Sequence, residues 1–155
     1  MPPRVILIVL AALVVTACIA AIVWSQRSKQ NPPSSDLDSL SDLEISRLAR
    51  DMAVVEELIK EGDLLKQPRE VEHWLLFDSE HNRDSCMAVV QAMGYQCEVL
   101  TPDEELPELI GFSATHVSAV DVDTIHKSSW ELVQVAQKHN GEYDGWETFV
   151  IRPDP

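Results

Sequence analysis

The sequence has little of what metal centres and catalytic sites are built from. Its five histidines stand apart along 155 residues without a paired ligand spacing, and it holds only three cysteines. It also contains no Gly-rich phosphate loop, no nucleophile elbow and no Ser/His/Asp order. We therefore expect no catalytic residue, no metal and no cofactor. A hydrolase would need a pocket in which titratable side chains gather.

Cysteine is too scarce for a disulfide framework. Cys18 lies in an apolar segment near the N-terminus, Cys86 in an expected helix and Cys97 in an expected strand. Two thiols in the rest of the chain fit a reducing compartment, where they act as small buried apolar groups. A disulfide between Cys86 and Cys97 is the alternative, and it is favoured only if the domain is periplasmic.

Basic residues are also scarce. The chain has 12 Lys and Arg residues against 26 Asp and Glu residues, and every acidic residue follows Trp24. No basic stripe interleaved with aromatic residues is present, which argues against direct binding of nucleic acid because the phosphate backbone would be repelled. A basic protein partner would instead be attracted. For most individual carboxylates, solubility is an equally good explanation.

One long apolar run is present near the N-terminus. Val5–Trp24 has no charged residue, and a helix of this length spans about 30 Å, the thickness of the hydrocarbon core of a bilayer. Residues 1–24 are therefore predicted to form an N-terminal transmembrane helix with Trp24 at the membrane interface. The alternative is a lipoprotein signal with Cys18 as the lipidated residue. The apolar run continues past Cys18, which favours the uncleaved anchor.

A linker and an amphipathic helix follow. Residues 25–40 are rich in Ser, Gln, Pro and Asp, as linkers are. A capping box begins at Ser41, and Gly62 ends the helix predicted for residues 41–62. Apolar residues recur along one face of this helix at Ile45, Leu48, Met52, Val55 and Ile59. This face is expected to pack on the following domain, and self-association through a short coiled coil is the alternative.

Residues 63–155 are predicted to form an α+β domain. Strands are expected at Val71–Phe77, Tyr95–Leu100, Phe112–Val122 and Tyr143–Ile151. Helices are expected after a cap at Asp78–Ser79 and after a cap at Asp123. This order is typical of a βαββαβ sandwich, in which a four-stranded antiparallel sheet carries two helices on one face.

The second face of that sheet needs a cover or binds a partner. The helix at residues 41–61 is the nearest candidate cover, and a partner segment is the functional alternative. Trp74 and Trp146 alternate out of the core in this scheme and are available for either role.

Two motifs give the strongest indication of function. Gly141–Thr148 reads GEYDGWET and combines an expected turn or bulge at Asp144–Gly145 with two large aromatic rings. Upstream, Lys66–Trp74 reads KQPREVEHW. With both motifs in this order, the stretch from Leu58 to Ile151 resembles the ribonuclease E inhibitor family, also called regulator of ribonuclease activity B. The resemblance implies a ferredoxin-like fold.

The resemblance also implies a binding protein, not an enzyme. Its partner would be a ribonuclease of the ribonuclease E type, or the scaffold region of that enzyme, whose cleavage of RNA it would lower or redirect. The candidate partner-binding residues are Trp74, Tyr143, Asp144 and Trp146. For Tyr143 and Trp146 the alternative is packing in the core, and for Asp144 it is a turn that satisfies the backbone.

The expected localisation follows from the same resemblance. Positive charges are nearly balanced, with Arg4 before the apolar run and Arg27 and Lys29 after it. A ribonuclease partner places the domain in the cytoplasm, so we expect a single-pass protein of the bacterial inner membrane with a cytoplasmic domain. The alternative function is that of a periplasmic or envelope-facing lipoprotein or membrane protein that uses the same fold for another protein partner.

Overall fold

The computed structural model describes residues 36–102 and 108–153. The chain divides into two compact units, residues 1–43 and 44–155, and the contacts given below belong to the second. The elements are α2 (Asp36–Lys60), β1 (Arg69–Phe77), α3 (Glu80–Ala92), β2 (Gln96–Val99), β3 (Gly111–Ser118), α4 (Val122–Lys138) and β4 (Gly141–Thr148). Helix α2 begins at Asp36, so it includes the last residues of the segment predicted as a linker.

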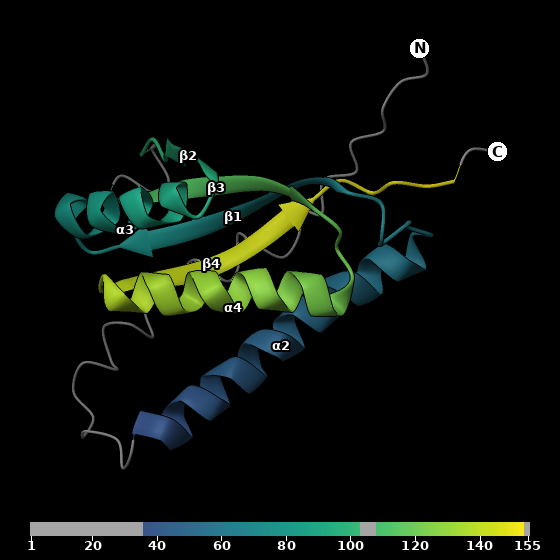
Figure 1. Cartoon of the computed structure of the whole chain (residues 1–155), viewed down its shortest axis with the longest axis horizontal. Helices are drawn as coiled ribbons and strands as arrows, with labels where there is room; N and C mark the ends of the chain where they lie inside the picture. The colour runs from purple at the N-terminus through teal and green to yellow at the C-terminus, as the bar shows by residue number, and fades with distance from the viewer. Residues whose placement is uncertain (1–35, 103–107, 154–155) are drawn as a thin grey trace. The chain divides into compact units, whose positions relative to one another are not determined.

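The four strands form one antiparallel sheet in the order β2-β3-β1-β4 (Figure 1). This confirms the predicted α+β domain with a four-stranded antiparallel sheet, and the strands and helices from β1 to β4 follow in the predicted order. Side chains alternate between the two faces of the sheet along β1, one of its two central strands. Val71, His73 and Leu75 are buried, whereas the residues between them are only partly covered.

Local signals fix the ends of helices α3 and α4. The Ser79 hydroxyl accepts a hydrogen bond from a backbone N–H of the first turn of α3, as expected of an N-cap. Gly94, with a φ of 100°, follows the end of that helix. Helix α4 is capped by Asp121 and not by the predicted Asp123, because the Asp121 carboxylate accepts the Thr124 N–H.

The core lies between the sheet and the helices. One cluster joins α3 and α4 to the sheet, and it consists of Leu75, Cys86, Val90, Phe112, Ala114, Leu132, Val133, Ala136 and Tyr143. A second cluster joins α2 and α4 to the sheet, and it consists of Val55, Leu58, Val71, Val120, Ile125 and Trp146. Removal of this apolar surface from water is the main driving force for folding.

Helix α2 packs on the same face of the sheet as α3 and α4. Its Val55 lies in one cluster with Val71 of β1 and Ile125 of α4. The expectation that this helix covers the opposite face is therefore wrong. The buried side chains of β1 explain which face of the sheet α2 covers. Val71 points toward α4, and the apolar residues of α2 pack against Val71 on that same face.

The apolar stripe predicted for α2 is only partly the buried one. Val55 is buried, whereas Ile45, Met52 and Ile59 are 63%, 42% and 57% exposed. Two charged residues, described below, occupy the buried face in their place. The spacing of apolar residues correctly indicated a helix, but it did not indicate which side of that helix meets the sheet.

A β-bulge in β4 turns Trp146 inward. The pairing of β4 with β1 shifts register next to Trp74, and Asp144 is the extra residue between the paired residues Tyr143 and Gly145. Tyr143 and Trp146 are three positions apart, so simple alternation would point them to opposite faces. With the extra residue both face the helices, which is why Trp146 does not point outward together with Trp74 as expected.

The expected localisation in the bacterial inner membrane is corrected. Within residues 36–102 and 108–153, no helix combines the length and the apolar character that crossing a bilayer requires. The longest described helix, α2, carries charged residues along its length. This finding contradicts the single-pass arrangement, which we withdraw. The predicted span Val5–Trp24 and the alternative lipidation site Cys18 lie outside the described residues.

Candidate functional site

The two sequence motifs lie on neighbouring strands. The upstream motif forms most of β1 and the downstream motif forms β4, and His73 pairs with Trp146 across them. The side chains of Tyr143 and Trp146 are each 6% exposed and face the helices, whereas Trp74 is half-buried and Asp144 is exposed. The structure therefore divides the four candidate residues into a buried pair and a pair that can be reached from outside.

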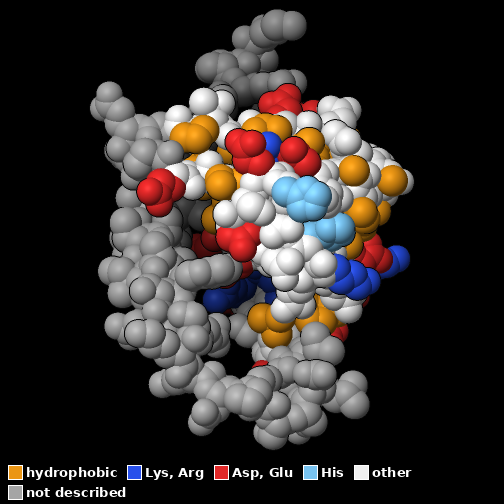
Figure 2. Space-filling model, turned by 90° about the vertical axis from the view of Figure 1, so that its left-hand side faces the viewer, with side chains coloured by type: hydrophobic (Ala, Val, Ile, Leu, Met, Phe, Trp, Pro, Cys, Tyr) orange, Lys and Arg blue, Asp and Glu red, His pale blue; other side chains and the backbone are white. Residues whose placement is uncertain are grey.

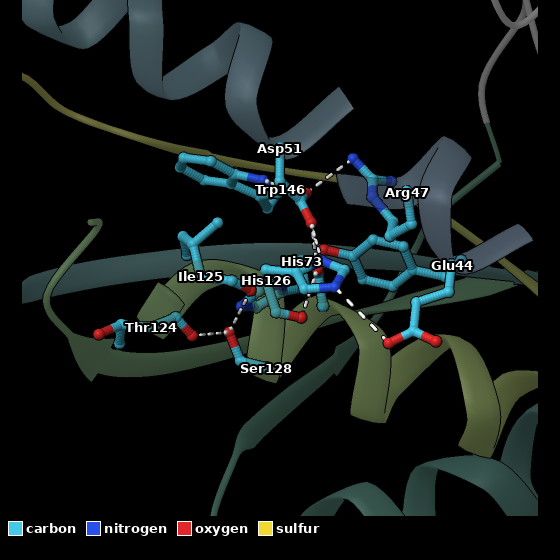
Figure 3. Close-up of polar contacts among 11 residues, drawn as sticks. Glu44, Arg47, Asp51, His73, Thr124, Ile125, His126, Ser128 and Trp146 are labelled. Carbon is cyan, nitrogen blue, oxygen red and sulfur yellow. Dashed lines mark hydrogen bonds and ion pairs between the residues drawn. The ribbon is translucent and has the colours of Figure 1, made fainter. Parts of the chain in front are cut away.

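Asp51 of α2 is the centre of the buried part of the site (Figure 3). Its carboxylate is fully buried and accepts hydrogen bonds from Trp146 Nε1 at 3.0 Å and from Ser129 Oγ at 2.5 Å. Arg47, one turn earlier, forms an ion pair with it at 2.9 Å, and His126 Nδ1 lies 3.2 Å away. Groups from α2, α4 and β4 thus satisfy one buried carboxylate, as a buried charge requires.

Arg47 links this carboxylate to Tyr143. Its guanidinium lies 5.1 Å from the centroid of the Tyr143 ring, within the range of a cation–π contact. Burial raises the pKa of Tyr143 well above its usual value, although the charge of Arg47 opposes part of that rise. The hydroxyl therefore stays neutral and can donate a hydrogen bond to His73, whose Nδ1 lies 2.7 Å from it.

A row of contacting imidazole and phenol rings extends from Tyr143 across the sheet. The ring of His73 stacks on that of His116 with 5.2 Å between the centroids, and the centroid of the Tyr95 ring lies 4.6 Å from that of His116. Burial above all, and then the charges of His116 and Arg47, lower the pKa of His73 to about 3. Burial also lowers the pKa of His116. Both rings are therefore neutral at physiological pH.

A pocket of about 700 Å³ lies at the outer end of this row, lined in part by Tyr95, His116 and Glu131. Burial, and then the charge of Glu131, raises the pKa of Tyr95 to about 12, so the phenol is neutral as well. No serine or cysteine is among the lining residues. The lining includes Thr115 and the carboxylates of Glu70 and Glu131, but within the described residues the buried Nδ1 of His116 has no hydrogen-bond partner, so no nucleophile is paired with that imidazole nitrogen.

Metal and thiol chemistry find no support in the described part of the chain. Residues 36–102 and 108–153 hold no group of three His, Cys, Asp or Glu side chains placed to bind a metal ion. Cys86 and Cys97 are free thiols, and burial raises the pKa of Cys86 to about 12 and that of Cys97 to about 11. Because the thiolate is the reactive form, both are unreactive near neutral pH.

The face of the sheet opposite the helices carries charge of one sign. Its outward positions are Glu70, Glu72, Trp74 and Leu76 of β1, Gln96 and Glu98 of β2, Gly111, Ser113, Thr115 and Val117 of β3, and Glu142, Gly145 and Glu147 of β4. Five of these residues are glutamates and none is Lys or Arg. We call this surface the acidic sheet face.

Two of its glutamates lie directly opposite each other. Glu72 of β1 and Glu147 of β4 are register partners. Burial, and then the charge of Glu72, raises the pKa of Glu147. Like charges at such positions weaken a sheet, so this arrangement costs the free protein stability. Figure 2 shows the side of the molecule that lies at the left of Figure 1, and on that side acidic, basic and histidine side chains stand among hydrophobic ones.

Reasoning from the sequence missed Arg47 and Asp51. The available signal was a pair of opposite charges four residues apart in the predicted helix. Such pairs are usually on the surface, and the apolar periodicity drew attention away from them. Only the folded arrangement, in which Trp146 Nε1 and Ser129 Oγ both donate to Asp51, shows why this carboxylate is buried.

Comparison with known proteins agrees with the two motifs. A family model described as regulator of ribonuclease activity B matches residues 49–148, from within α2 to the end of β4. The matched region therefore includes Asp51 as well as Tyr143 and Trp146.

Two relatives carry the same description. A regulator of ribonuclease activity B from Pseudoalteromonas atlantica is 30% identical over 101 residues, which are 63% of this chain and 85% of that protein. A regulator of ribonuclease activity B from Photobacterium profundum is 24% identical over 101 residues, which are 62% of this chain and 75% of that protein.

Proposed function

The chain belongs to the regulator of ribonuclease activity B family, and from this we propose that it binds a ribonuclease of the ribonuclease E type, or the scaffold region of such an enzyme. Binding lowers or redirects cleavage of RNA by occlusion. Family membership is the observation that carries this proposal. The more specific part of the proposal is that the ribonuclease is of the ribonuclease E type. This part rests on the resemblance of the two motifs to the ribonuclease E inhibitor family.

The chain acts on the ribonuclease and not on the RNA. With 26 acidic against 12 basic residues, its surface repels phosphates and attracts a basic protein. The acidic sheet face, which has no Lys or Arg at its outward positions, supports this choice. The chain performs no catalysis itself in this scheme.

The four candidate residues take two roles in this proposal. Trp74 and Asp144 contact the partner, because their side chains can be reached in the free chain. Tyr143 and Trp146 keep α2 and the sheet together through Arg47 and Asp51. The fold that presents them is a ferredoxin-like sandwich, an assignment that rests on the strand order β2-β3-β1-β4.

Self-association through α2 stays a prediction. The exposed residues Ile45, Met52 and Ile59 recur every seven positions on the outer side of this helix, a spacing that suits a short coiled coil. Two heptads give little buried area, so any such association would be weak.

The proposed function is tested by reconstitution. A purified ribonuclease of the ribonuclease E type cleaves a fluorescent single-stranded RNA while the full chain is titrated into the reaction. We expect cleavage to change and then level off when the chain and the enzyme are equimolar, and the chain alone to leave the RNA intact. Raising the RNA concentration tenfold at fixed enzyme should leave the equivalence point unchanged. An equivalence point that moves with RNA would show that the chain sequesters RNA, and the proposal would be wrong.

A further inference from the structure

Trp74 stands in the middle of the acidic sheet face. Its register partners are Ser113 on β3 and Gly145 on β4, which are both small. A Cβ atom added at Gly145 would meet nothing within 4 Å, so the space beside the indole on that side is open. The ring points away from the helices and is only half-buried. A large aromatic ring therefore lies beside open space on the outside of the sheet.

Carboxylates surround this indole on three strands. Glu72 lies two residues before it on the same face of β1, Glu98 lies in the same row on β2, and Glu142 and Glu147 lie on β4 to either side of the residue that pairs with Trp74. Within the described part of the chain, no Lys, Arg or His forms an ion pair with any of these four glutamates.

An arginine side chain fits these surroundings better than other groups do. A guanidinium stacks on an indole face and donates forked hydrogen bonds to carboxylates, whereas a lysine ammonium offers the charge without the planar fork. Phosphate groups would be repelled by the same carboxylates. Val117, which is 67% exposed on the same face, adds an apolar contact beside the charged ones.

We propose that the acidic sheet face is the docking surface for a basic, arginine-containing segment of the partner protein, with one arginine stacked on Trp74 between Glu72 and Glu147. The identity of that partner as a ribonuclease rests on the proposed function, whereas the chemistry of the segment rests on the sheet face itself. An arriving guanidinium relieves the repulsion between Glu72 and Glu147, so stability that the free sheet lacks is recovered in the complex.

The test uses the full chain and two synthetic decapeptides, one alternating arginine and serine and the other alternating lysine and serine. Calorimetric titrations are run at low and at physiological salt. We expect the arginine peptide to bind at least about five-fold more tightly than the lysine peptide, and both to bind more weakly as salt rises. Trp74→Ala should remove the preference for arginine while the residual, salt-dependent attraction remains.

Charge variants locate the surface. The double variant Glu72→Gln/Glu147→Gln should weaken binding of the arginine peptide by about ten-fold or more, because loss of a hot-spot contact in an interface lowers the affinity by at least this factor. It should melt no lower than the parent, since it removes a like-charge pair. The matched control Glu56→Gln/Glu57→Gln removes the same charge from the exposed side of α2 and should change binding less than about two-fold.

Four results would overturn the proposal. Equal weakening in both double variants would show attraction by net charge alone, and unchanged binding in Glu72→Gln/Glu147→Gln would place the contact elsewhere. Self-association of the parent that disappears in the same variant would assign the face to a second copy of the chain. The ribonuclease assay separates this proposal from the proposed function. If Glu72→Gln/Glu147→Gln still regulates cleavage like the parent, the docking surface is wrong, whereas a parent chain without any effect on cleavage refutes only the proposed function.

Discussion

The indole N–H of Trp146 donates a hydrogen bond to the carboxylate of Asp51 over 3.0 Å, and this contact joins two residues that are 95 positions apart in the chain. The same carboxylate takes the charge of Arg47, which in turn covers the ring of Tyr143. The aromatic residues of the downstream motif therefore hold helix α2 on the sheet. The following predictions test this arrangement.

The two motif tryptophans should differ in their effect on stability. Trp146→Ala should cost about 3–5 kcal/mol, because it opens a cavity in the core and removes one of the hydrogen-bond donors to the buried carboxylate of Asp51. Trp74→Ala should cost less, at most about 2 kcal/mol, because part of its ring is already in water. Urea denaturation of both variants measures the difference. Equal costs would contradict the assignment of Trp146 to the core and Trp74 to the outer face.

The buried ion pair should be strongly coupled. Asp51→Ala should destabilise the fold by about 3–5 kcal/mol, since the charge of Arg47 would remain buried without its partner. Adding Arg47→Met to this variant should recover much of the loss, because no unpaired charge is then left inside. A double-mutant cycle in urea gives the coupling energy. The exposed pair Glu57–Lys60 on the same helix is the control, and its cycle should yield less than about 1 kcal/mol.

The free energy of unfolding should decrease as pH is lowered, because of the buried His73. The pKa of this ring is about 3 in the folded chain against 6.5 for an ordinary histidine, so the unfolded state binds more protons between these values. The contribution is complete above pH 6.5 and is lost as pH falls, by about 1.4 kcal/mol for each pH unit. His73→Gln should reduce this slope in unfolding curves measured between pH 5 and 8 and leave the part that comes from the lowered pKa of His116, whereas His81→Gln on the surface should keep the whole slope. A parental slope in His73→Gln would show that another group is responsible.

Two glycines of the outer sheet face should tolerate substitution very differently. A Cβ at Gly111 would lie 2.6 Å from the backbone oxygen of Leu75, so Gly111→Ala must displace the central strand. A Cβ at Gly145 would meet nothing within 4 Å, so Gly145→Ala should melt within a few degrees of the parent. Overpacking of the first kind costs about 1–3 kcal/mol. Similar melting temperatures for both variants would contradict the close approach at Gly111.

The type of each element and its place along the chain were accessible from the sequence because both depend on local pattern. Ser79 and Gly94 mark the ends of α3 with short-range chemistry, and the alternation in β1 gives its buried residues directly. The motif around Trp146 also indicated the family before any contact was known. These signals act within a few residues, so a reading along the chain can recover them.

The site itself was harder to predict from the sequence. It depends on which strand residues face inward and on contacts between residues that are far apart in the chain. One extra residue, Asp144, decides whether Trp146 faces in or out, and alternation cannot show where a bulge falls. The buried role of Arg47 and Asp51 depends on Ser129 and Trp146, which approach only in the folded chain.

The glutamates on the outer side of the sheet also matter when chains are crowded, as they are during synthesis. Broad sheet surfaces tend to stack on one another, and stacking between copies is a common start of aggregation. Here two stacked copies would bring five carboxylates of each against five of the other without a basic residue between them at the outward positions. The side chains that invite a cationic partner thus also keep identical chains apart.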